Sequence, residues 1–149
     1  MFVALAACGA GSGEGLDQNG RPPAAGGGGF VLPPVVGLAP TFDSIQNNVL
    51  TVTCAVPGCH GGGGAQQGLR LDAGFAYGNL VNVASPRDAS LIRVVPGDAD
   101  ASFIIQKLEG IKTLDGTQIL GDRMPDGGPY LPQSTIDVIR LWIANGALQ

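Results

Sequence analysis

Cys54, Cys59 and His60 are the residues whose types and spacing are best suited to chemistry in this sequence. Two neighbouring thiols, the second followed directly by the only histidine, can form thioethers with a haem while the imidazole ligates its iron. The usual attachment motif is Cys-x-x-Cys-His, whereas four residues separate the cysteines here. Pro57-Gly58 favours a sharp turn that lets the additional residues bulge outward. Cys54 and Cys59 are therefore candidates for covalent haem attachment, with His60 as the candidate proximal iron ligand.

The composition restricts the ligand on the opposite face of such a haem. With one histidine in the chain, a methionine sulfur is the remaining usual ligand. Met1 is removed or lies in a signal segment, which leaves Met124. Met124 lies in a Gly- and Pro-rich loop, where Pro125 restricts it to extended conformations. Met124 is therefore the candidate distal ligand, the alternative being an ordinary core or surface methionine.

The N-terminal residues are typical of an exported protein. Cys8 follows Leu5-Ala6-Ala7, which resembles a bacterial lipobox with a lipid-modified cysteine. Because the preceding residues are uncharged and fewer than the roughly 7–15 of an apolar signal region, we expect residues 1–8 to be the end of a lipoprotein-type signal. A chance match is the alternative.

Residues 9–40 contain ten glycines and five prolines. Such a composition cannot hold a helix or bury a core. It predicts a flexible tether with a coil dimension of about 30 Å, or else a disordered segment without function. The folded domain is expected to span residues 41–149.

Three segments of this domain have helical signals. The predicted helices span residues 41–50, 102–108 and 134–145, with Thr41 and either Asp98 or Asp100 as N-caps and with Gly110 and Gly146 at C-terminal ends. The region from Gly68 to Val83 predicts a loop and a short helix. We therefore expect an all-α chain, mainly helical with long Gly- and Pro-rich loops.

The charge distribution excludes some classes of partner. The net charge is −4, and the eight basic residues are scattered. This pattern predicts neither nucleic-acid binding nor a polybasic membrane patch. No apolar segment reaches the roughly 20 residues of a membrane-spanning helix, so membrane association is expected through a lipid anchor only.

The order of these features resembles the class I-like monohaem cytochrome c domains of exported bacterial proteins. The resemblance covers about residues 41–148 and is carried by Gly68-Leu69-Arg70-Leu71-Asp72, by Pro96-Gly97-Asp98 and by Arg123-Met124-Pro125. It implies a cytochrome c-like fold around one haem. The four residues that the resemblance assigns to haem are Cys54 and Cys59 as thioethers, His60 as proximal ligand and Met124 as distal ligand.

Further contacts are implied by the same resemblance. The final helix around Trp142 would pack across the first helix around Ile45 and Val49. Arg70 and Arg123 are candidates for pairing with the haem propionates, the alternative for each being a solvated surface arginine.

Iron with both axial positions filled has no open position for a substrate. The resemblance thus implies an electron carrier and not an enzyme, although peroxidase-like activity stays open. Its partners would be redox proteins bound transiently over a small surface. The expected location is the periplasm or the outer membrane, where a lipid at Cys8 would anchor the protein.

Other interpretations of the same residues remain open. Cys54 and Cys59 could form a disulfide in a secreted interaction domain without haem. A haem peroxidase or sensor would result if Met124 left an iron position open. Structural zinc is a poorer interpretation, because it takes four ligands and the folded region offers only Cys54, Cys59 and His60.

Overall fold

The computed structural model describes residues 31–110 and 120–149. In chain order their elements are α1 (Phe42–Ile45), the π-helix η1 (Gln46–Cys54), the 3-10 turn η2 (Gln66–Gly68), α2 (Ala76–Leu80), β1 (Ala84–Ser85), β2 (Asp88–Ile92), α3 (Phe103–Glu109) and α4 (Gln133–Ala144). The predicted lipobox cysteine, Cys8, and residues 9–30 of the predicted tether lie outside the described residues.

The expectation of an all-α chain is wrong. β1 and β2 form a two-stranded antiparallel sheet, in which Ser85 pairs with Asp88 and Ala84 with Ile92. Two residues, Pro86 and Arg87, connect the strands. Strands this short give too little sequence for a period of two to be recognised, which explains the error. The described part of the chain is mixed, with short helices and one small sheet.

α1 continues directly into η1, and together they confirm and extend the helix predicted over residues 41–50. Thr41 is the N-cap, because its hydroxyl oxygen accepts a hydrogen bond from the Ser44 N–H at 3.4 Å. Ile45 and Val49 are each 1% exposed, so the periodic apolar face is the buried one. The wider turns of η1 carry the helix four residues beyond the predicted end, to Cys54.

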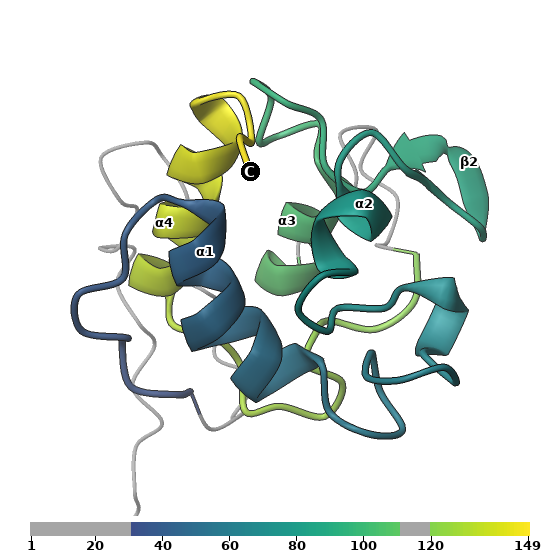
Figure 1. Cartoon of the computed structure of the whole chain (residues 1–149), viewed down its shortest axis with the longest axis horizontal. Helices are drawn as coiled ribbons and strands as arrows, with labels where there is room; N and C mark the ends of the chain where they lie inside the picture. The colour runs from purple at the N-terminus through teal and green to yellow at the C-terminus, as the bar shows by residue number, and fades with distance from the viewer. Residues whose placement is uncertain (1–30, 111–119) are drawn as a thin grey trace, which may run out of the picture.

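α4 confirms the helix predicted at residues 134–145 to within a residue at each end. Figure 1 shows α1 crossing in front of α4, with α3 near the centre of the view. The rings of Phe42 and Trp142 lie 5.6 Å apart, and Ile45, Val49 and Trp142 share one apolar core. The expected packing of the last helix across the first is therefore confirmed.

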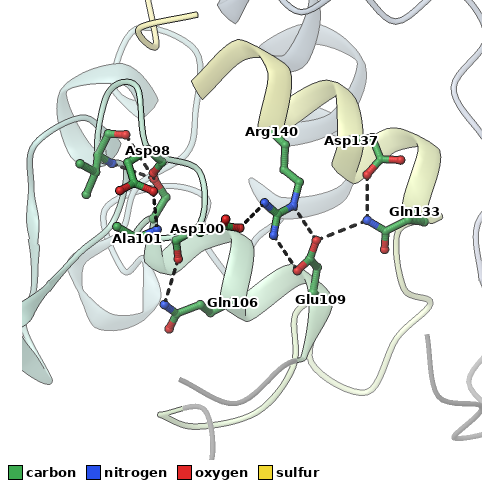
Figure 2. A network of polar contacts seen from close by, with 10 residues as sticks. Asp98, Asp100, Ala101, Gln106, Glu109, Gln133, Asp137 and Arg140 are labelled. Carbon is green, nitrogen blue, oxygen red and sulfur yellow. Dashed lines mark hydrogen bonds and ion pairs between the residues drawn. The ribbon is translucent and has the colours of Figure 1, made fainter. Parts of the chain in front are cut away.

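A polar network joins α3 to α4 (Figure 2). The Arg140 guanidinium donates to both carboxylate oxygens of Glu109, at 2.7 and 2.9 Å, and a third N–H donates to Asp100 at 2.7 Å. The Glu109 side chain is 6% exposed, whereas that of Asp100 is 68% exposed. The bidentate, buried half of the network is the part that fixes α3 against α4.

α3 lies where a helix was predicted and ends at Gly110, whose φ of 69° is left-handed. Its predicted N-caps are wrong. Ser102 occupies the N-cap position, Asp98 accepts a hydrogen bond from Ala101 in the preceding turn, and Asp100 pairs with Arg140. The Pro-Gly-Asp turn thus ends before the helix begins.

Residues 31–40, which the sequence assigned to the tether, contact the domain. The Leu32 N–H donates to the Tyr130 carbonyl at 2.9 Å, and Val31 forms a parallel bridge with Tyr130. The side chains of Leu32 and Leu38 pack against the core. This contact lies beside the loop that carries Met124.

Candidate functional site

Cys54 is the last residue of η1, so the first helix sets the position of its thiol. The side chain is partly buried and packs against the core. Burial, together with the nearby Cys59, raises the pKa of the Cys54 thiol to about 12. Cys59 is exposed, and both cysteines are free thiols. The helix thus presents one sulfur from the core side and the loop presents the other from the solvent side.

A compact turn accommodates the four residues between the cysteines. The Cys59 and Gly61 N–H groups both donate to the Val56 carbonyl, at 3.1 and 3.2 Å, and the His60 N–H donates to the Cys54 carbonyl at 3.2 Å. Gly58 has a φ of 84°, which glycine adopts without strain. The turn therefore brings His60 back to the end of η1 despite the long spacing.

The His60 ring has a defined tautomer because of its hydrogen bond. Nδ1 lies 3.1 Å from the Leu69 carbonyl oxygen, which can only accept, so Nδ1 carries the proton and Nε2 keeps its lone pair. Burial lowers the pKa of His60, and the positive charges of Arg93 and Lys107 act in the same direction. A neutral imidazole with its Nε2 lone pair unprotonated is the form that ligates metals.

Met124 lies in the predicted loop, partly buried against the core. Its peptide bond to Pro125 is cis. The Met124 N–H donates to the Lys107 carbonyl at 2.8 Å, while the Lys107 ammonium donates to the carbonyls of Leu120 and Asp122. Lys107 of α3 thus holds the Met124 loop, and its charge also acts on His60. α3 therefore positions Met124, one of the two candidate iron ligands.

Arg70 and Arg123, the two candidates for pairing with haem propionates, already have partners within the protein. Arg70 donates to Asp72 at 2.7 Å and lies over the Phe75 ring, 3.5 Å from its centroid. Asp72 also accepts from the Gly62 N–H at 2.8 Å, so this pair braces the loop that follows His60. Arg70 has a structural contact there that does not depend on a bound group.

Arg123 is engaged in the same way. Its Nε donates to the Leu108 carbonyl at 2.9 Å, and its guanidinium lies 4.2 Å from the centroid of Tyr130. These contacts attach the Met124 loop to the end of α3.

Arg93 is a further candidate for binding an anionic group, and it lies in no recognisable sequence motif. It is 7% exposed, and burial lowers its pKa. Nη1 donates to the Asn79 carbonyl at 2.8 Å and Nη2 to the Gln67 carbonyl at 3.0 Å. No carboxylate in the described ranges pairs with it. The sequence feature that could have identified Arg93 is its position as a single charged residue within the apolar run Leu91 to Val95.

Two cavities are present in the described part of the chain, and the second is lined by Thr53, which directly precedes Cys54. One of about 460 Å³ is lined by residues of α1 and the C-terminal segment, including Phe42 and Trp142. The other, of about 310 Å³, lies between residues 32–35, η1 and the start of α4. Neither is lined by Cys59, His60 or Met124, so the candidate site is defined by its donor atoms and not by a cavity.

The donor set fits a haem of the c type. Two free thiols precede an imidazole whose Nε2 is unprotonated, and the Met124 thioether lies in a loop held by α3, a different helix from the one that ends at Cys54. Within residues 31–110 and 120–149, no three Cys, His, Asp or Glu side chains gather as a set able to hold a metal ion. None of the helices in these ranges has the length and apolar composition needed to span a membrane.

Comparisons with known proteins give no family for this chain. No family model, no curated protein and no solved structure matches it.

Proposed function

We propose that this protein carries one c-type haem bonded through Cys54 and Cys59 and exchanges single electrons with other redox proteins. The observation that carries the proposal is the His60 hydrogen bond to Leu69, which leaves Nε2 unprotonated in the residue that directly follows the second of two free cysteines. A buried histidine with a purely structural hydrogen bond would give no reason for two cysteines just before it in the sequence. When bound, the haem supplies an iron that gains and loses one electron reversibly.

The side chains have distinct roles in this proposal. His60 ligates the iron through Nε2, and its Nδ1–H···O=C bond to Leu69 fixes the ring and raises its basicity. Met124 supplies a soft sulfur, which favours the reduced metal. With His60 and Met124 both bound to the iron, no position would be open to a small molecule, and the chain would move electrons without transforming a substrate.

Location and partners follow from the same proposal. Attachment of haem to Cys54 and Cys59 in bacteria takes place after export, so Cys8 is proposed as a lipid anchor in the periplasm or at the outer membrane. The partners are redox proteins that bind transiently. The net charge of −4 favours basic surfaces on those partners.

The test uses residues 1–149 behind an export signal, in bacteria that have a c-type haem maturation system. Haem should remain on the wild-type chain in a denaturing gel and be lost from the double variant Cys54→Ser/Cys59→Ser. Cys8→Ser is the matched control, because it removes a cysteine and should retain the haem. A colourless, folded wild-type protein with Cys54 and Cys59 oxidised to a disulfide would refute the proposal and favour an interaction domain without haem.

The ligands are tested on the same preparation. His60→Ala should abolish the low-spin spectrum, and Met124→Ala should alter the ferrous low-spin spectrum while haem stays attached. The ferrous wild-type protein should not bind carbon monoxide without denaturant. Binding of carbon monoxide would show an open iron position and favour a peroxidase or sensor over an electron carrier.

A further inference from the structure

Arg93 carries a buried positive charge that has no carboxylate partner among residues 31–110 and 120–149. It is 7% exposed, and it donates hydrogen bonds to two neutral carbonyls, those of Asn79 and Gln67. A buried charge without an opposite charge is strongly unfavourable. The two carbonyls occupy two of the five N–H donors of a guanidinium. Three donors are therefore left for an anion.

The Gln67 carbonyl places Arg93 beside the candidate haem site. The turn η2 (Gln66–Gly68) contacts the attachment motif at both of its ends. The Gln66 N–H donates to the Cys59 carbonyl at 2.7 Å, and the Leu69 carbonyl binds His60 Nδ1 at 3.1 Å. Arg93 donates to the residue between them. One turn thus connects the guanidinium to a thioether cysteine and to the proximal ligand.

The other two arginines near the site are less suited to an anion. Arg70 already forms an ion pair with Asp72 at 2.7 Å. Arg123 donates to the Leu108 carbonyl and lies over the Tyr130 ring. A new anion at Arg70 would have to compete with Asp72. An anion at Arg93 would meet no competing carboxylate within the described residues.

We propose that Arg93, and neither Arg70 nor Arg123, pairs with a propionate carboxylate of the bound haem. The assignment rests on the proposed function, since it requires haem at this site. A planar guanidinium binds a carboxylate through two parallel N–H···O bonds. Its positive charge near the iron favours the reduced state, because reduction lowers the positive charge of the iron.

The test is a redox titration of the haem-bearing full chain. Arg93→Met should shift the equilibrium constant for reduction about tenfold toward the oxidised form. For a one-electron couple this lowers the reduction potential by about 59 mV. Arg70→Met and Arg123→Met are matched controls that remove the same charge and keep a similar stem. Because Arg70 and Arg123 also hold loops near the candidate ligands, the potentials of these two variants should fall by clearly less than that of Arg93→Met rather than not at all.

A second variant keeps the test informative if Arg93→Met does not fold. Arg93→Lys retains the charge but not the planar fork, so its potential should fall by less than that of Arg93→Met. The propionate-bending band in the resonance Raman spectrum should shift in Arg93→Lys and stay unchanged in Arg70→Met. A role for Arg93 without a propionate contact would lower the melting temperature and leave this band unchanged.

The outcomes separate this assignment from the proposed function. Haem on the wild-type chain, with the Arg93 variants matching its potential and Raman band, overturns the assignment and leaves the function standing. An equal or larger fall in potential in Arg70→Met or Arg123→Met also overturns it. A wild-type chain without covalent haem refutes the proposed function, and the assignment with it.

Discussion

Gly61→Ala is the most direct perturbation of the turn that returns His60 to η1. A Cβ at Gly61 would contact the Ala55 carbonyl oxygen and lie 2.8 Å from its carbon, and 3.0 Å from the Val56 carbonyl carbon. These atoms belong to the backbone of the turn, so no flexible side chain can move aside. The substitution must displace the turn itself.

The matched control lies in the same glycine run. A Cβ at Gly63 meets nothing within 4 Å, and Gly63 does not have a left-handed φ. We expect Gly61→Ala to lower the free energy of unfolding by about 1–3 kcal/mol, the usual cost of forcing atoms into a packed site. Gly63→Ala should change it by less than about 0.5 kcal/mol.

The assay is urea unfolding of the purified full chain, with the amount of covalent haem per protein measured on the same samples. For a domain of this size, the expected loss in Gly61→Ala corresponds to a fall in melting temperature of roughly 4–12 °C. Haem content should fall in Gly61→Ala as well, because displacement of the turn moves His60 and Cys59. Equal stability and equal haem content in the two variants would refute the geometry of this turn.

Two further predictions concern the α3–α4 network and the cysteines. Glu109→Gln should lower the free energy of unfolding by about 2–4 kcal/mol because Arg140 keeps a buried charge, whereas Asp100→Asn removes an exposed partner and should cost less than about 1 kcal/mol. Similar losses in urea unfolding of the two variants would contradict this ranking. In protein made without haem, Cys59 should react with iodoacetamide well before Cys54, because a thiol with a pKa of about 12 stays protonated until the pH approaches that value. Equal alkylation rates at pH 8, resolved by peptide mass spectrometry, would rule out the described environment of Cys54.

The helices that carry the longest apolar periodicity could be predicted from the sequence. Ile45 and Val49 on the first helix, and Ile139 and Trp142 on the last, are buried as their spacing predicts. The extension of the first helix to Cys54 could not be predicted, because it depends on the wider turns of η1. Periodicity identifies the buried face but does not fix the hydrogen-bond pattern that ends a helix.

Some residues of the candidate site could likewise be predicted from the sequence, and others could not. Cys54, Cys59 and His60 were recognisable because their chemistry depends on neighbours in the sequence. Arg93 contacts the turn at Gln67, and Lys107 contacts the Met124 loop, only through pairings of distant segments that no local pattern reports. The sequence offered Arg70 and Arg123 as candidates, each with a solvated surface arginine as the alternative, because they stand in recognisable motifs. Their partners, Asp72 and Tyr130, explain their positions without reference to a haem.

The pairing of Leu32 with Tyr130 determines where a mechanical load would enter the domain. A pull on the chain before residue 31 would reach this parallel bridge before it reached the first helix. Tyr130 is only six residues beyond Met124. Tension on the N-terminal side would therefore act first on the loop of the proposed distal ligand and only afterwards on the helix that presents Cys54.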